Sequence, residues 1–422
     1  MGILDIKESS QEKDRCGSRK SVGLLLFLSW LVYTVGNVGR LNYSVSMVAI
    51  IDDIGATKSE AGLVASFFFF AYGFGQLVNG LLCHKYNTRI VVFCSLIAAA
   101  SANIGLPLCR SVGAMKWIWL LNGAVQSVLW SSLVKLQSEY LDEKGIEKGI
   151  IVMSTTTAAG TFIAYGLSAL NIAIFSWRVM FYIGGGLLAI CSVAWLFGIG
   201  YVQKNLSKYE IKKTGSSSLS NGNKMRAVVI VSLCFVLMLA ALNGFVRDGI
   251  NTWVPSLLKE VYGIPAYFSV ILTLILPLIS VLGAYVAKLV YVKLKNDILV
   301  GGIFFAFGGV FCGLILWLYQ YTLGLTVAMF AIVAFSMSAV QNVITSAVPF
   351  RLRTVGQSGF FAGVINASCY VGSTLTSFIL GGVADSVGWN MVMIILLVLT
   401  SIGSVCAFLF SPYWGKRITP LL

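Results

Sequence analysis

Long apolar runs, separated by few charged residues, dominate this chain. A transmembrane helix needs about 20 mostly apolar residues, and runs of this kind occupy most of the sequence. Residues 298–350 contain no charged residue and are long enough for two helices, with a turn predicted at 319–321. The twelve predicted spans lie at 21–39, 61–83, 90–109, 117–134, 149–177, 179–203, 227–246, 261–287, two within 298–350, 355–384 and 386–415.

Composition excludes a soluble protein of this size. Hydrophobic residues make up 58% of the 422 residues and charged residues only 11%, against about a quarter charged in soluble domains. Because backbone groups in lipid must satisfy their hydrogen bonds internally, the apolar runs are predicted to be helices. The predicted fold class is therefore an all-α integral membrane protein with twelve helices.

Basic residues predict the orientation in the membrane. With both termini in the cytoplasm, the cytoplasmic segments hold 21 Lys and Arg residues and the outer loops hold five. This excess on one side is the usual signature of the cytoplasmic face. We therefore expect a multi-pass protein of the cell membrane. The net charge of +14 is explained by loops that face anionic lipid, so no nucleic-acid partner is expected.

The chain also repeats itself. Residues 39–40 (GR) correspond to 246–247 (VR), and 124–126 (AVQ) recur at 339–341. A segment rich in Lys, Ser, Gly and Asn lies between the two copies and has the composition of a linker. The predicted parts are a tail (1–20), a six-helix half (21–201), a linker (202–226), a second half (227–412) and a tail (413–422). This organisation resembles the major facilitator superfamily, whose substrate site lies between two parallel six-helix repeats.

A loop motif adds to this resemblance. Residues 80–89 (GLLCHKYNTR) are similar to the superfamily's G-x-L-a-D-r-x-G-r-r loop, in which acidic and basic residues latch the halves. Gly80, Lys85 and Arg89 fit the pattern and are expected to gate the site. His84 stands where the family has an acid. It is either a pH-sensitive gate or a neutral loop substitution.

A second set of gating candidates lies near the inner end of the fourth span. Lys135 and Glu139 are four residues apart, so they form either an i,i+4 ion pair or part of a gate. Apart from Glu139 and Asp248, the spans offer no acid to carry a coupling proton, which favours exchange over proton symport. The chain has no G-x-x-x-x-G-K-[ST] loop, so transport driven by ATP is not expected.

Two arginines at the margins of the predicted spans are the most informative residues. Arg40 and Arg247 each cost about 2.5–3.5 kcal/mol at mid-membrane, so they are expected to face water or a ligand. Asp248 follows Arg247, but neighbouring helical residues point about 100° apart, so we expect no strong pair. Polar residues on several helices are predicted to line one cavity with the arginines: Asn37, Tyr43, Tyr72, Gln76, Gln126, Thr157, Asn243, Asn251 and Gln341.

Two guanidinium groups suit a phosphate group, whose oxygens accept bidentate hydrogen bonds. Residues 39–42 (GRLN), 71–74 (AYGF) and 247–255 (RDGINTWVP) resemble the organophosphate:phosphate antiporters, typified by the glycerol-3-phosphate and hexose-6-phosphate transporters. The resemblance implies that Arg40 and Arg247 hold the phosphoryl group. The glycerol-3-phosphate member has a lysine where Gln76 stands and a histidine where Thr157 stands, which leaves the organic half of the substrate open.

The sequence thus predicts a transporter and not an enzyme, working as a monomer without a metal or cofactor. The expected activity is exchange of an organic phosphate, such as a sugar phosphate or glycerol phosphate, for inorganic phosphate by alternating access. One alternative is a proton-coupled symporter of organic carboxylates such as hexuronates, with Asp248 as the proton site. The other alternative is a transporter-like membrane sensor of sugar phosphate. Export of amphipathic cations is disfavoured because the arginines would repel them.

Overall fold

The computed structural model describes residues 2–82, 85–206, 223–351 and 358–417. Within these ranges the chain is built from helices, and twelve helical spans are long and apolar enough to cross a membrane. The first six spans are α1 (Gly2–Ile54), α2 (Lys58–Leu82), α3 (Thr88–Gly105) with η2 (Leu106–Leu108), α4 (Val112–Gln126) with α5 (Leu129–Tyr140), α6 (Glu143–Ile174) and α7 (Trp177–Asn205). The last six are α8 (Asn223–Tyr262), α9 (Ala266–Thr273) with α10 (Ile275–Leu294), α11 (Asp297–Leu318), α12 (Leu323–Asn342) with η3 (Val343–Ala347) and α13 (Val348–Arg351), α14 (Ser358–Ser386) and α15 (Trp389–Arg417).

The predicted fold class is confirmed, and most differences concern the ends of helices. The sequence prediction ended the first and seventh spans at 39 and 246, just before their arginines, whereas α1 continues to Ile54 and α8 to Tyr262. A charged side chain does not break a helix if it faces a polar region, so hydropathy marks the end of an apolar run and not the end of the helix. The turn predicted at 319–321 does lie between α11 and α12. Most of the predicted linker falls on residues 207–222, which lie outside the described residues.

The two repeats end their first helices in the same way. Gly55 follows α1 with a φ of 69°, and Gly263 follows α8 with a φ of 63°. Glycine adopts this left-handed conformation without a steric penalty and commonly ends helices in this way. Arg40 and Arg247 precede these glycines by nearly the same number of residues. The two arginines therefore lie at a similar depth along their helices.

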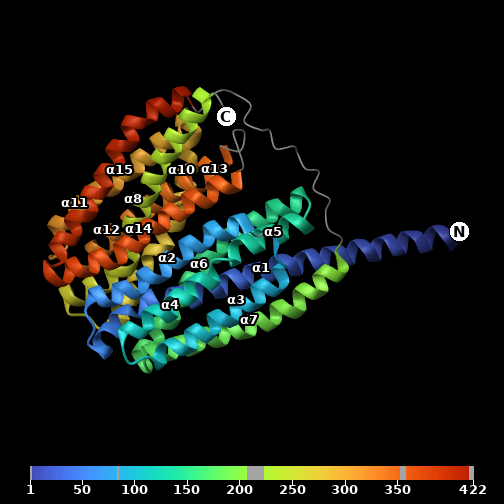
Figure 1. The fold of residues 1–422 in the computed structure, drawn as a ribbon, viewed down its shortest axis with the longest axis horizontal. Coiled ribbons are helices and arrows are strands. Elements are labelled where there is room, and N and C mark those ends of the chain that lie inside the picture. Colours follow the sequence, from blue (N-terminus) through green and yellow to red (C-terminus); the bar gives the residue numbers. More distant parts are fainter. Residues whose placement is uncertain (1, 83–84, 207–222, 352–357, 418–422) are drawn as a thin grey trace.

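The two halves lie against each other along α2 and α14 (Figure 1). Gly62 of α2 is so close to the carbonyl oxygen of Ser377 that a Cβ atom there would clash. Near the same level, Ser66 Oγ donates a hydrogen bond to the carbonyl oxygen of Thr374 at 2.6 Å. Small residues allow transmembrane helices to pack with their backbones this close. The contact between the halves therefore depends on the absence of a side chain at Gly62.

Ion pairs join the halves at one end of the bundle, which we call the closed end. It comprises the end of α1, the start of α2 and the ends of α8 and α14. There Lys58 lies 3.0 Å from Glu260 and 3.3 Å from Asp385, and Lys259 pairs with Asp52. Figure 1 shows the ribbons of α1–α7 and of α8–α15 together at this end and diverging toward the end that carries the N-terminus.

Candidate substrate-binding site

Arg40 lies near the middle of the apolar span of α1, Lys20–Ile54, among neutral partners. Its Nη1 donates a hydrogen bond to Tyr72 Oη at 3.0 Å, and its Nη2 donates to Asn37 Oδ1. The guanidinium carbon lies 5.6 Å from the ring centre of Tyr33 and 5.4 Å from that of Tyr72, within the range of a cation–π contact. Among the described residues, no carboxylate forms an ion pair with Arg40. Its positive charge is therefore not balanced by any carboxylate that the structure describes.

Buried amides hold this part of α1 in place. The carbonyl oxygen of Gly39 accepts hydrogen bonds from Asn103 Nδ2 of α3 at 3.0 Å and from Asn122 Nδ2 of α4 at 3.1 Å. Gln126 Nε2 in turn donates to Asn122 Oδ1 at 2.9 Å. These bonds fix α1 against α3 and α4 one residue before Arg40. The guanidinium is consequently held on a rigid element.

A narrow recess beside Arg40 is formed by α1, α2, α4 and α5. Its lining residues are Tyr33, Gly36, Asn37, Arg40, Tyr72, Gln126 and Leu129. The side-chain Nδ2 of Asn37 is buried and makes no hydrogen bond. An unpaired buried donor costs about 1–3 kcal/mol, so a ligand oxygen that reached this amide would remove an existing penalty. The structure thus brings three of the predicted site residues, Asn37, Tyr72 and Gln126, together next to Arg40.

Arg247 differs from Arg40 because it has an acidic partner. Its Nε and Nη2 lie 2.8 Å from the two carboxylate oxygens of Asp248, a bidentate ion pair. Ser373 Oγ of α14 also donates to Asp248. The expectation that Arg247 and Asp248 would not pair is therefore wrong. Because the arginine side chain is long and flexible, the 100° between neighbouring Cα–Cβ bonds does not keep the charged groups apart.

Tyr370 of α14 lies beside Tyr72 and was not found from the sequence. Its ring centre lies 4.9 Å from that of Tyr72, in an edge-to-face arrangement. Tyr72 in turn accepts a hydrogen bond from Arg40 Nη1 at 3.0 Å. The only available signal was an aromatic residue in the middle of the eleventh span, where no polar stripe drew attention to it. Tyr370 therefore brings the second half of the protein to the first arginine.

The remaining predicted residues form bridges nearby. Gln76 Oε1 accepts a hydrogen bond from Asn366 Nδ2 of α14, which joins the halves one helical turn from Tyr72. In the second half, Asn243 Nδ2 donates to Gln341 Oε1 of α12 at 2.6 Å. Asn243 precedes Arg247 by one turn of α8, so this pair lies on the same stretch of helix as the ion pair. These amides form a polar layer next to the arginines.

Three predicted residues do not join this group. Tyr43 is fully buried, and its Oη donates to the carbonyl oxygen of Ala61 at 3.0 Å, so the structure places it in the packed core. Asn251 takes part through its backbone, whose carbonyl oxygen accepts from Tyr165 Oη at 3.4 Å. Thr157 is exposed on α6. Helical spacing had grouped Tyr43 with Arg40, but it does not show that the Tyr43 hydroxyl bonds the backbone at Ala61.

The predicted gating loop lies at the end of α2 remote from the closed end. Gly80 and Lys85 are exposed there, and His84 lies outside the described residues. Arg89 Nε donates to the carbonyl oxygen of Leu196 in α7 at 3.1 Å. This contact stays within the first half. A role of the loop in gating therefore remains a prediction.

Lys135 and Glu139 do form the i,i+4 ion pair considered above. Lys135 Nζ lies 3.9 Å from Glu139 Oε1, and it donates to the carbonyl oxygen of Tyr86 at 3.0 Å. Tyr86 precedes α3, so the lysine ties the inner part of α5 to this loop. A structural contact is thus confirmed, while a gating role is still a prediction.

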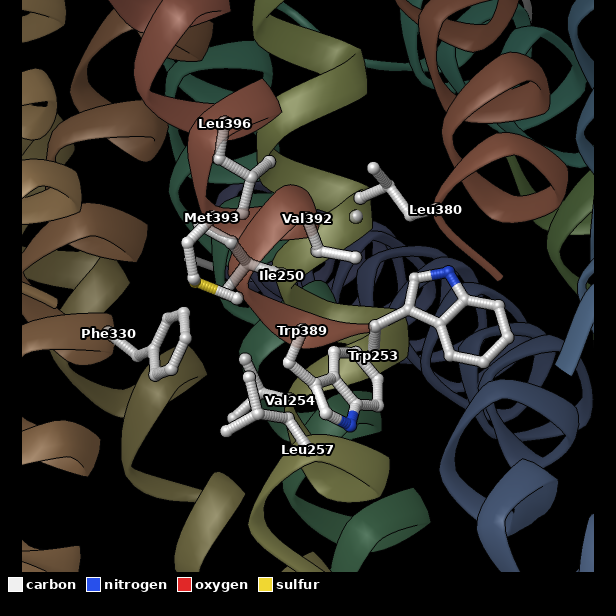
Figure 2. A pocket seen from close by; sticks show the side chains of 11 residues that line it. Ile250, Trp253, Val254, Leu257, Phe330, Leu380, Trp389, Val392, Met393 and Leu396 are labelled. Atoms are coloured by element: carbon white, nitrogen blue, oxygen red, sulfur yellow. The ribbon is translucent and has the colours of Figure 1, made fainter. Parts of the chain in front are cut away.

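A second pocket lies toward the closed end and is apolar (Figure 2). It is enclosed by side chains of α8, α12, α14 and α15: Ile250, Trp253, Val254, Leu257, Phe330, Leu380, Trp389, Val392, Met393 and Leu396, with Gly249. None of these side chains offers a charge to an anion. The group around Arg40 and Arg247 is therefore the better candidate for an anion site.

Comparisons with known proteins agree with the transporter architecture. The family model of the Major Facilitator Superfamily matches residues 22–370. A probable hexose phosphate transport protein of Chlamydia pneumoniae is 23% identical over 424 residues, covering 92% of this chain and 90% of that protein. The voltage-gated purine nucleotide uniporter SLC17A9 of Mus musculus is 24% identical over 259 residues, or 57% of this chain. That match spans 54% of the uniporter, about half of its length.

The fold is also similar to solved structures. A bacterial homolog to the human lysosomal transporter Spinster, in an inward-facing and unoccupied conformation, superposes with a TM-score of 0.76. The match covers 94% of this chain and 98% of that chain at 13% sequence identity, so it shows a common fold. The family model extends over most of the sequence and includes Arg40, Arg247 and Tyr370. The chain belongs to the Major Facilitator Superfamily.

Proposed function

We propose that this transporter exchanges an organic phosphate for inorganic phosphate by alternating access. The observation that carries the proposal is Arg40, a guanidinium at mid-span whose described partners are all neutral. A charge in this position is costly unless a ligand or water compensates it. A phosphate group can accept two hydrogen bonds from one guanidinium, which suits the fork of Arg40.

Two relatives support a phosphorylated solute. The Chlamydia pneumoniae protein is named for hexose phosphate, and the mouse protein for purine nucleotides. Both solutes combine phosphate with a sugar. The aromatic rings of Tyr33, Tyr72 and Tyr370 and the amides of Gln76 and Gln126 offer stacking surfaces and hydrogen bonds to such an organic group.

Exchange follows from the charge of the empty site. Arg40 carries a positive charge that no described side chain balances, and its transfer across the membrane centre without an anion is unfavourable. A bound phosphate group cancels the charge and allows the halves to reorient. In the cell membrane, with both termini in the cytoplasm, the closed end faces outward.

Proton-coupled symport of an organic carboxylate is the second candidate. The observation that favours it is Asp248, an intramembrane acid in direct contact with a site arginine. In this case uptake would follow an imposed pH gradient, and inorganic phosphate would not compete.

Transport in proteoliposomes distinguishes these candidates. Under the proposed exchange, uptake of radiolabelled phosphate requires phosphate or a phosphate ester inside the vesicles and is lost in Arg40→Ala. Arg110→Ala, at an exposed arginine outside the spans, is the matched control and should transport normally. Equal uptake into empty and phosphate-loaded vesicles would contradict exchange.

A further inference from the structure

Asp248 occupies one particular edge of the Arg247 guanidinium. Its two oxygens accept from Nε and Nη2 at 2.8 Å each, and Oδ2 also accepts from Ser373 Oγ. A guanidinium has five N–H donors, so the edge formed by Nη1 and the second hydrogen of Nη2 is not used by Asp248. Arg247 can therefore contact an anion while its carboxylate partner stays in place.

The ion pair changes the charge that a substrate meets. Two guanidinium groups and one carboxylate give the empty site a formal charge of +1, whereas the arginines alone would give +2. A phosphate monoester carries about −1.5 to −2 charges near neutral pH. A doubly charged phosphate group would thus leave one uncompensated negative charge in the middle of the membrane, where burying a charge is costly.

Asp248 is the group that can remove this excess charge. Among the described residues, the titratable side chains around the ion pair are Tyr165 of α6 and Cys369 and Tyr370 of α14. Tyrosine and cysteine side chains already hold their proton near neutral pH, and the guanidinium groups of Arg40 and Arg247 are fully protonated. Among these described groups, only the carboxylate of Asp248 can accept a proton.

We propose that Asp248 sets the charge of the substrate site by taking up one proton whenever a doubly charged anion binds between Arg40 and Arg247. This rests on the proposed function, since it assumes that the arginines hold the anion. The proton moves from water to a carboxylate oxygen of Asp248, and no other bond is made or broken. The neutral acid still accepts from Arg247 and Ser373 through its remaining lone pairs, and the loaded site becomes electrically neutral. A singly charged anion binds without the proton.

Proton counting on the purified full-length chain tests this inference. Sulfate is the decisive probe because it stays doubly charged through the neutral range and, unlike phosphate, cannot carry the proton itself. Calorimetric titrations in buffers of different ionisation enthalpy give the number of protons taken up per anion bound. We expect about one proton per sulfate in the wild-type protein and none in Asp248→Asn. Asp53→Asn removes a carboxylate that pairs with Arg178 at the closed end and should leave the count unchanged.

The possible results separate this inference from the proposed function. Sulfate binding without proton uptake by the wild-type protein overturns the role of Asp248, even if Asp248→Asn does not fold. Binding of phosphate with no binding of sulfate also overturns it, because the site would then accept only singly charged anions. If neither inorganic phosphate nor any phosphate ester binds, the proposed function itself fails.

Discussion

Lys58, the first residue of α2, lies 3.0 Å from the carboxylate of Glu260 in the last turn of α8. The same lysine lies 3.3 Å from Asp385 near the end of α14, and Trp389 Nε1 donates to Glu260 at 2.8 Å. One lysine of the first half is therefore held by two acids of the second half. The network therefore holds the two halves together at the closed end.

Loss of this lysine should shift the conformational equilibrium. Ion pairs at partly exposed sites contribute about 0.2–1 kcal/mol each, so the loss of two pairs in Lys58→Met should weaken the closed end by roughly 0.4–2 kcal/mol. This corresponds to a change of about two- to thirtyfold in the ratio of the two states. Distances between spin labels on α2 and α14 near the closed end would report the change.

The matched control is Lys116→Met, since Lys116 contacts the rings of Phe67 and Trp117 within the first half. It should leave the distance distribution as in the wild type. Identical distributions in Lys58→Met and wild type would show that the network does not hold the closed end.

The second prediction concerns the close contact between α2 and α14. A methyl group at Gly62 would clash with the carbonyl oxygen of Ser377, and a backbone atom cannot turn away as a side chain can. Gly62→Ala should therefore destabilise the packed interface by about 1–3 kcal/mol, in the range of other overpacked sites. A Cβ atom at Gly166 would contact nothing within 4 Å, so Gly166→Ala should be neutral. Thermal unfolding in detergent checks both, and equal midpoints would refute the role of this contact.

The membrane spans and their charged residues could be predicted from the sequence, because hydropathy and charge are local properties. The twelve spans follow from apolar runs, and Arg40 and Arg247 stand out as charges inside them. The closed-end network could not be predicted, because Lys58 and Asp385 are 327 residues apart. Lys58 and Lys259 are two of the five basic residues that the sequence predicts in outer loops, where they indicate only orientation. Only the folded chain shows that each has an acidic partner in the other half.

The site was predicted in part for a related reason. Helical spacing identifies which residues share a face, so it grouped Asn37 with Arg40 correctly. It says nothing of how far a flexible side chain bends, which is why the Arg247–Asp248 pair was missed. It also cannot distinguish a tyrosine that lines a site from one in the core, which is why Tyr43 was included and Tyr370 was not.

The third prediction separates these tyrosines. Tyr72 Oη accepts a hydrogen bond from Arg40, whereas Tyr43 Oη donates to the backbone at Ala61. A hydrogen bond to a charged group contributes about 1.5–3 kcal/mol, so Tyr72→Phe should change the affinity for a competing phosphate ester by roughly tenfold or more. Tyr43→Phe removes the same atom and should leave this affinity unchanged while lowering stability. Equal inhibition constants in all three proteins would exclude Tyr72 from the site.

The fourth prediction tests the ion pair by stability instead of transport. Removal of one partner of a buried ion pair leaves an unpaired charge and costs about 3–5 kcal/mol, whereas removal of both partners can be nearly neutral. Arg247→Gln should therefore be markedly less stable than wild type, since Asp248 loses both contacts of 2.8 Å. The double variant Arg247→Gln/Asp248→Asn should recover most of this loss, although it should not regain phosphate binding. If the double variant is no more stable than Arg247→Gln, the two residues are not energetically coupled, and the carboxylate is compensated by other groups such as Ser373.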